Sequence, residues 1–216
     1  MKRIVVIEDL PIALEGIKLF IANLDDFELI GQYDKAIDFI NDIGSIEVDV
    51  VITDINMPGM DGIEMTNLAL EKDPDLKIIA LSMHTDRKYL YEMIKAGAMG
   101  FVLKQSPETM LEAAINEVLL GRFYIPDALL RVSSIEIAEI DNTSLADIKN
   151  TNDLSDVEIE IIHLLSHGYD YDQLANNSSL SKKSVDSAKE QLMKKTGTRS
   201  KAELIVWAIK TGILTV

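Results

Sequence analysis

The sequence predicts an α/β protein in which a five-stranded, doubly wound parallel sheet is followed by a second, all-helical domain. Two short runs rich in β-branched residues, 3–7 and 48–53, predict buried strands, and acidic residues follow both. Stretches with apolar residues at three- and four-residue spacing separate the strand-like runs. Strands that alternate with helices form βαβ units, whose helices cover both faces of a parallel sheet.

Five strands and five helices are expected before residue 121. The strands are predicted at 3–7, 29–31, 48–53, 78–81 and 100–103, and the second has the weakest pattern. The helices are predicted at 11–24, 35–43, 62–72, 86–96 and 107–120. In the last of these, Leu111, Ile115 and Val118 fall on one helical face, as expected for a helix that packs on the sheet.

The remainder of the chain changes character twice. In residues 123–152, Ile125–Pro126 breaks the preceding pattern, and the stretch from Ser133 onward mixes polar residues with scattered isoleucines, which indicates a linker. Beyond it, four short helical patterns without a strand are predicted at 155–166, 171–177, 181–195 and 200–211. Ser155 precedes Glu158 at the spacing of a capping box. We therefore expect one domain at 1–122, a linker at 123–152 and a second domain at 153–216.

Composition limits the classes of function. The 216 residues include no cysteine, which excludes disulfides and thiolate metal sites. The first apolar run is short and ends at Glu8, and no run approaches the roughly 18 apolar residues of a membrane span. We therefore expect a cytoplasmic protein with no membrane partner. The net charge of -15 argues against nucleic acid, yet residues 181–201 hold seven basic residues against two acidic ones.

Polar and charged groups stand at the ends of the predicted strands. Glu8 and Asp9 follow the first strand and Asp54 follows the third, so the three carboxylates should meet at the ligand-binding edge of the sheet. Clustered carboxylates repel one another unless a cation lies between them, and an all-oxygen site of this kind suits Mg²⁺. Ser82 and Lys104 follow the fourth and fifth strands, where a hydroxyl and a cation can bind a phosphate. Each residue alone could be an ordinary surface group, but the whole set indicates a phosphate site.

These residues and their surroundings resemble the receiver domain of two-component response regulators, which has the CheY-like, flavodoxin-like fold. The resemblance covers about residues 1–122 and includes Glu8-Asp9, the run DINMPGMDG at 54–62, Ser82 and the run FVLK at 101–104. It implies a role for each matching residue, as follows: Asp54 is the phosphoacceptor, Asp9 a direct Mg²⁺ ligand, Glu8 its acidic neighbour, the Asn56 backbone carbonyl a further Mg²⁺ ligand, Ser82 the switch hydroxyl, Lys104 the phosphate-pairing lysine and Phe101 the switch aromatic.

The resemblance also implies a mechanism. Asp54 would attack a phosphohistidine on a sensor histidine kinase, and self-phosphorylation and autodephosphorylation of Asp54 would be the only chemistry of this chain, which is otherwise not an enzyme. The new phosphoryl group would draw Ser82 inward and let Phe101 turn inward. Because Phe101 lacks the hydroxyl of the more frequent tyrosine, such a switch would work through packing alone.

The C-terminal helices resemble a LuxR-type helix-turn-helix, and with the receiver the whole chain resembles a NarL/FixJ-type response regulator. The matching residues include Leu154-Ser155, Glu158, Leu174-Ala175, Ser184-Val185 and Gly197. The resemblance implies that 181–195 is a recognition helix for promoter DNA and that the protein is a homodimer when phosphorylated or DNA-bound. The basic residues expected to engage the duplex are Lys182, Lys183, Lys189, Lys194, Lys195, Arg199 and Lys201.

Two positions of the recognition helix depart from the family pattern. Asp186 stands where lysine is usual, and Ala188 replaces a frequent histidine. An acidic residue that faces a phosphate weakens the electrostatic part of DNA binding. The alternative function is therefore a receiver with a degenerate helix-turn-helix domain that acts through protein–protein contacts. The helix-turn-helix pattern and the local basic charge favour a phosphorylation-controlled transcription factor.

Overall fold

A five-stranded parallel sheet forms the centre of the first of two units, Met1–Ile125 and Pro126–Val216. The computed structural model describes residues 1–83, 87–126, 129, 154–167, 169, 171, 173–174, 182–198 and 201–214. The elements of the first unit are β1 (Lys2–Ile7), α1 (Pro11–Ala22), β2 (Phe27–Tyr33), α2 (Ala36–Asp42), β3 (Val50–Asp54), α3 (Gly62–Lys72), β4 (Lys77–Ser82), α4 (Arg87–Ala96), β5 (Gly100–Leu103) and α5 (Glu108–Leu119). This alternation confirms the predicted fold class.

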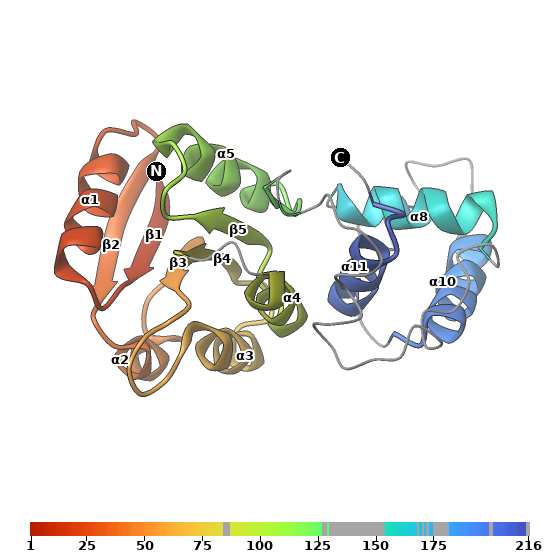
Figure 1. Ribbon diagram of the computed structural model, residues 1–216, viewed down its shortest axis with the longest axis horizontal. Helices are drawn as coiled ribbons and strands as arrows, with labels where there is room; N and C mark the ends of the chain where they lie inside the picture. The colour runs from red at the N-terminus through yellow and green to blue at the C-terminus, as the bar shows by residue number, and fades with distance from the viewer. Residues whose placement is uncertain are drawn as a thin grey trace. The chain divides into compact units, whose positions relative to one another are not determined.

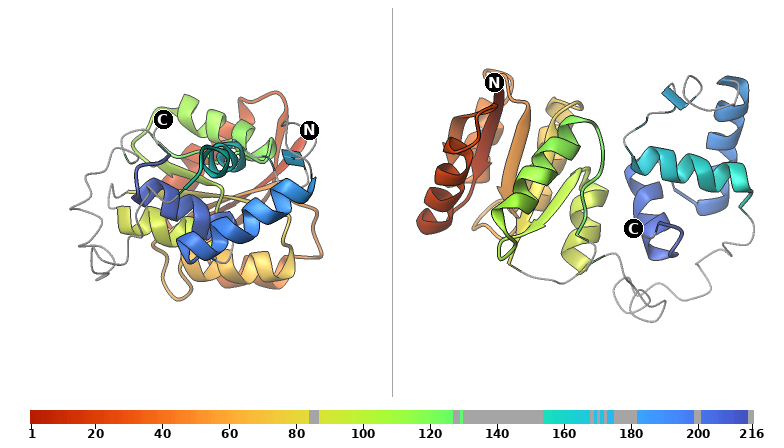
Figure 2. Two further views of the ribbon diagram at one scale, coloured as in Figure 1. Left: turned by 90° about the vertical axis from the view of Figure 1, so that its right-hand side faces the viewer. Right: turned by 90° about the horizontal axis from the view of Figure 1, so that it is seen from above.

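The strand order β2-β1-β3-β4-β5 places β3 at the centre of the sheet. All neighbouring strands are parallel, so their carboxyl ends lie along one edge. Helices α1 and α5 cover one face, and α2, α3 and α4 cover the other (Figures 1 and 2). Every residue of β3 is buried, which explains its nearly continuous apolar run. In the edge strand β2, exposed positions alternate with partly buried ones after the buried Phe27, and the strand is longer than the predicted 29–31.

A glycine fixes the path of the chain behind Asp54. The Gly62 amide donates to the Ile55 carbonyl at 2.8 Å, which closes the loop between β3 and α3. A Cβ atom at Gly62 would lie 2.3 Å from the Asp54 carbonyl oxygen, so no larger side chain fits without displacing the backbone. Asp61 caps the helix that begins at Gly62, because its carboxylate accepts a hydrogen bond from the Glu64 amide at 2.8 Å. The start of α3 thus holds the end of β3 in place.

The second unit contains α8 (Asp156–Ser166), α10 (Lys182–Thr196) and α11 (Lys201–Lys210), which contact one another. The predicted capping box is present, because the side chains of Ser155 and Glu158 each accept from the backbone amide of the other. The three helices bury one apolar core between them, formed by Ile161, Ile162, Leu165, Val185, Leu192, Leu204, Ile205, Ala208 and Ile209. Trp207 is only partly buried.

Several predicted features lie partly outside the described residues. Of the short helix expected at 171–177, positions 171, 173 and 174 have helical backbone. The first unit continues to Ile125, three residues past the expected boundary at 122, while most of the expected linker is outside the described part. No helix in the described segments is long and apolar enough to cross a lipid bilayer.

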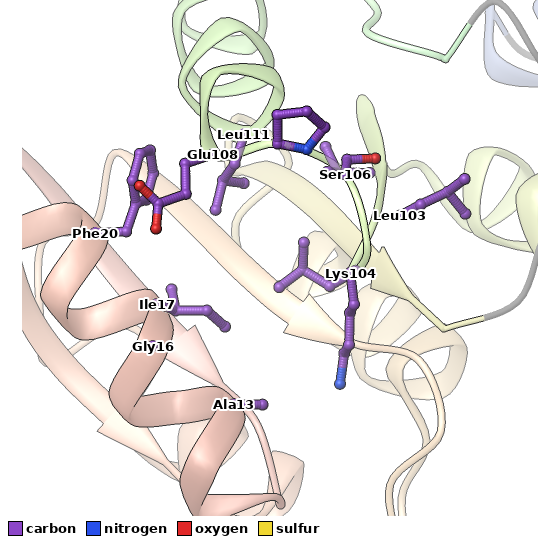
Figure 3. Close-up of a pocket in the computed structure, with 12 residues that line it drawn as sticks. Ala13, Gly16, Ile17, Phe20, Leu103, Lys104, Ser106, Glu108 and Leu111 are labelled. Carbon is purple, nitrogen blue, oxygen red and sulfur yellow. The ribbon is translucent and has the colours of Figure 1, made fainter.

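A cavity of about 270 Å³ lies between α1 and the start of α5 (Figure 3). Its lining includes Gly16, Ile17 and Phe20 from α1 and Leu111 from α5. A Cβ atom added at Gly16 would meet no other atom within 4 Å. Gly16 therefore lies in the middle of α1 at a position where there is room for a side chain.

We predict that Gly16→Ala stabilises the receiver unit, because alanine loses less backbone entropy than glycine when a helix forms. The gain in the free energy of unfolding should be about 0.5–1 kcal/mol, measured by urea denaturation. The matched control is Gly100→Ala, whose Cβ would lie 2.8 Å from Ile79 Cγ1 and should destabilise the protein. A Gly16→Ala variant that unfolds at lower urea concentration than the wild type would contradict this description of α1.

Candidate functional site

Three carboxylates meet at the carboxyl edge of the sheet. Glu8 and Asp9 follow β1, and Asp54 is the last residue of the adjacent β3. Each of the three offers one oxygen, and these oxygens lie within 4.8 Å of one another. Glu8 and Asp54 are buried, with 1% and 5% of their surfaces exposed. The acidic cluster expected from the strand ends is therefore formed.

The Lys104 ammonium lies between two of these carboxylates. Its Nζ is 2.7 Å from Glu8 Oε2 and 2.9 Å from Asp54 Oδ2, and only 9% of the side chain is exposed. Lys104 follows β5, so its long side chain reaches across the end of β4 to β3 and β1. Its backbone amide also donates to the Ser82 carbonyl at 2.8 Å, which fixes where the side chain begins. One cation thus offsets part of the repulsion among the carboxylates.

Burial raises the pKa of Glu8 above its ordinary value, because the charged form loses contact with water. The nearby Asp54 charge acts in the same direction, while the ion pair with Lys104 opposes both. The pocket therefore holds more negative charge than Lys104 alone neutralises. Such a pocket favours the binding of an additional cation.

The carboxylate of Asp54 is oriented by the backbone that follows it. Asp54 Oδ1 accepts a hydrogen bond from the Ile55 amide at 2.7 Å, while Oδ2 faces Lys104. The neighbouring Asp9 Oδ1 is buried and accepts no hydrogen bond from any residue that the structure describes. An oxygen of this kind is available to a metal ion, and carboxylate oxygens are the ligands that Mg²⁺ prefers. Glu8, Asp9 and Asp54 thus fit a small divalent cation.

The other site residues expected from the sequence lie on β4 and β5 or directly after β3. Ser82 is fully buried at the end of β4, and Asn56 follows Asp54 by two residues with an exposed side chain. Phe101 is also fully buried, three residues before Lys104 on β5. Its ring position is inward in the structure, whereas the sequence led us to expect an inward turn only as part of the switch.

The second unit carries the basic residues expected to bind DNA. Lys182, Lys183, Lys189 and Lys194 of α10 are exposed, while Arg199 and the expected first helical residue, Ser181, lie outside the described part of the chain. Lys189 Nζ lies 4.4 Å from the centre of the Tyr171 ring, a cation–π contact. Exposed carboxylates at Asp186 and Glu190 share the helix with these lysines.

Two further lysines expected to contact DNA also have partners within the unit. Lys195 Nζ is 2.7 Å from Glu158 Oε2, and Lys201 Nζ donates to the Tyr169 carbonyl at 3.2 Å. Burial opposes ionisation of Glu158, but hydrogen bonds from Lys195 and Ser155 outweigh it and lower the pKa of the carboxyl. Sequence reasoning identified Glu158 as a capping residue but missed its ion pair with Lys195. The pairing of a carboxylate with a lysine 37 residues away has no local signal in the sequence.

Comparison with known proteins gives two family matches. The response regulator receiver domain matches residues 4–116, and the luxR family of bacterial regulatory proteins matches residues 152–208. The oxygen regulatory protein NreC of Staphylococcus carnosus is 30% identical over 98% of this chain and 99% of its own length.

Two solved structures of RcsB give further similarity. One is a structure of RcsB from Salmonella typhimurium that concerns conformational dynamism for DNA interaction. Its sequence is 25% identical to this chain, the match covers 95% of this chain and 97% of the RcsB chain, and the TM-score is 0.56. The other holds two RcsB dimers bound to two parallel DNAs. It is 25% identical, covers 97% of this chain and 98% of its own, and has a TM-score of 0.56.

We predict that Glu8→Gln raises the free energy of unfolding at pH 7 in the absence of divalent cations. Because the folded-state pKa of Glu8 lies above its ordinary value, the folded state loses stability as Glu8 ionises with rising pH. The difference between the variant and the wild type should therefore be present at pH 7. It should shrink as the pH falls below the ordinary glutamate pKa of about 4.3.

Urea denaturation of both proteins between pH 4 and pH 7 measures this difference. Glu28→Gln, at an exposed position of the edge strand β2, is the control for the loss of one carboxylate outside the pocket. A wild type more stable than Glu8→Gln at pH 7 would contradict the account of charge in this pocket.

Proposed function

The chain belongs to the response regulators that join a receiver domain to a LuxR-type DNA-binding domain, and from this we propose that phosphorylation of Asp54 controls its binding to promoter DNA. The observation that supports the proposal best is the position of Lys104, whose Nζ contacts both Glu8 and Asp54. A lysine beside buried carboxylates can stabilise additional negative charge placed on one of them. Phosphorylation of Asp54 would add such charge.

In the proposed reaction, a carboxylate oxygen of Asp54 attacks the phosphorus atom of a phosphohistidine on a sensor histidine kinase. The bond from oxygen to phosphorus forms as the bond from phosphorus to the histidine nitrogen breaks, and the imidazole leaves. Lys104 offsets the charge on the phosphoryl oxygens, and the Ile55 amide holds Asp54 by its other oxygen. Hydrolysis by water, the autodephosphorylation of the same residue, returns the carboxylate.

We propose Mg²⁺ as the cofactor, held by Glu8, Asp9, Asp54 and the backbone carbonyl of Asn56. The buried Asp9 Oδ1 without a hydrogen-bond donor among the described residues and the raised pKa of Glu8 support this assignment. When bound, Mg²⁺ supplies positive charge that offsets the phosphoryl oxygens during transfer.

The proposed switch consists of Ser82, Phe101 and Lys104. The Ser82 hydroxyl lies at the end of β4, beside the strand that carries Asp54, and we propose that it donates to a phosphoryl oxygen. Phe101 is buried on β5 and lacks a hydroxyl, so its part in the switch is packing alone. Phosphorylation then changes the relative stability of two arrangements of the receiver.

The second unit provides the output. We assign residues 1–122 to the receiver, 123–152 to the linker and 153–216 to the DNA-binding domain, in a cytoplasmic protein. The structure of RcsB dimers on DNA supports the proposal that this chain also binds duplex DNA as a homodimer. Output through protein contacts alone is not favoured, because the luxR family matches residues 152–208. We propose that the exposed lysines of α10 contact phosphates, with Arg199 and Lys201 beside them.

The phosphorylation of Asp54 is tested directly with acetyl phosphate and Mg²⁺. The wild type should gain one phosphoryl group by intact mass, and chelation of Mg²⁺ by EDTA should prevent the gain. Asp54→Ala should gain none, because the nucleophile is absent. Asp61→Ala, which removes only the cap of α3, is the control and should still be phosphorylated. Undiminished phosphorylation of Asp54→Ala would disprove the proposed site.

Substitution of an exposed lysine and of a lysine paired within the second unit should have different effects. Lys183→Ala should weaken binding to duplex DNA and lower the slope of log affinity against log salt by about one, because one phosphate contact is lost. Lys195→Ala should instead lower the stability of the second unit by about 1–3 kcal/mol, because it leaves the carboxylate of Glu158 buried without its cation.

Fluorescence anisotropy with a labelled random duplex at several salt concentrations measures the first effect, and urea denaturation measures the second. Lys77→Ala, in the receiver strand β4, is the control for both. An unchanged salt slope for Lys183→Ala and Lys194→Ala together would rule out α10 as the DNA-contacting helix.

A further inference from the structure

The chain does not leave the receiver directly at the end of α5. Gly121, with φ of 78°, ends the helix, and its amide and that of Arg122 donate to Val118 and Glu117 carbonyls. Residues 122–126, called here the exit segment, then run beside β5. Tyr124 and Gly100 form a parallel bridge there.

Two backbone hydrogen bonds hold the exit segment on the sheet. The Tyr124 amide donates to the Met99 carbonyl at 2.9 Å, and the Phe101 amide donates to the Tyr124 carbonyl at 2.8 Å. The Tyr124 side chain packs against the apolar core beneath α5 together with Met99 and Leu119. Among the residues that the structure describes, Tyr124 is thus the one that pairs with the outer edge of β5, and it belongs to the segment that leads to the second unit.

The same short strand carries the functional residues. Phe101 is fully buried, and Lys104, three residues later, contacts Glu8 and Asp54. On its inner edge, β5 pairs with β4 along its whole length, from Gly100 opposite Ile79 to Leu103 opposite Ser82. A Cβ atom at Gly100 would lie 2.8 Å from Ile79 Cγ1, so this inner contact is close. On its outer edge, the two backbone hydrogen bonds at Tyr124 replace this full-length pairing.

We propose that Tyr124 is a positioning residue of the receiver switch: its backbone hydrogen bonds and its packed ring together hold the exit segment on Phe101 and β5, and phosphorylation of Asp54 releases it. This inference rests on the proposed phosphorylation of Asp54. A phosphoryl group extends outward from the carboxylate and draws Lys104 with it, which displaces β5. β5 is paired over its full length with β4, whereas on its other side the described part of the chain pairs with it at Tyr124. The displacement therefore breaks the outer pairing first. The exit segment then leaves the sheet.

The coupling between these sites is reciprocal. If phosphorylation releases the exit segment, then a variant whose exit segment is already released must favour phosphorylation. Tyr124→Pro removes the amide that donates to Met99, and Tyr124→Ala removes the ring that packs on the core. Tyr124→Phe keeps both backbone hydrogen bonds and the ring, and is the conservative variant.

Amide hydrogen exchange of the full-length wild type tests the release without a substitution. After treatment with acetyl phosphate and Mg²⁺, exchange at the Phe101 and Tyr124 amides should be at least threefold faster, while the amide of Ile52 in the central β3 stays unchanged. Unchanged exchange at Phe101 in protein whose mass shows a phosphoryl group on Asp54 would overturn the inference and leave the proposed function standing. Failure of Asp54 to gain the phosphoryl group would overturn both.

The affinity of the unphosphorylated protein for beryllofluoride, a non-covalent mimic of the phosphoryl group, tests the reciprocal effect at equilibrium, which a purely structural role of Tyr124 would not produce. With Mg²⁺ present, Tyr124→Pro and Tyr124→Ala should bind beryllofluoride with a dissociation constant at least threefold lower than that of the wild type, and Tyr124→Phe with the wild-type value. Arg122→Ala, which removes an exposed partner of Glu117 in the same segment, is the matched control and should also keep the wild-type dissociation constant. Equal dissociation constants for Tyr124→Ala and wild type, with both proteins folded, would overturn the inference.

Discussion

The contact of one ammonium group with two buried carboxylates is the constraint on which the receiver depends. Lys104 neutralises part of the charge that Glu8, Asp9 and Asp54 bring to the edge of the sheet, and it does so from a strand two positions away from Asp54. A phosphoryl group or a metal ion that enters this cluster changes the partners of Lys104. Because Lys104 follows β5, a change in the charge of Asp54 acts on the residue at the end of β5.

Most of the receiver could be predicted from the sequence, because its signals are local. The β-branched run that became β3 is buried on both faces, and an acidic or polar residue follows each of the strands that form the pocket. The extent of β2 was underestimated, since its residues Glu28 and Gln32 interrupt the apolar pattern on an edge strand. The pairing of Tyr124 with β5 was also missed, because a single bridge after a helix has no periodic pattern.

The second unit shows the limits of reading charge from sequence. Seven basic residues between 181 and 201 were expected to meet DNA, yet Lys195 pairs with Glu158, Lys201 donates to the Tyr169 carbonyl, and Lys189 lies over the Tyr171 ring. Some of these basic residues thus make contacts within the second unit, and the other lysines of α10 are exposed. The exposed Asp186 and Glu190 further reduce the positive charge of α10, which weakens the electrostatic attraction that this helix can exert on a phosphate backbone.

We propose that phosphorylation in the first unit changes the affinity of the second unit for DNA. The most direct measurement compares the affinity of the full-length chain, with and without acetyl phosphate, for one duplex enriched from a random library at fixed salt. We expect protein phosphorylated on Asp54 to bind about 5- to 150-fold more tightly, the usual range for coupling between two sites. Equal affinities for fully phosphorylated and unphosphorylated protein would contradict it.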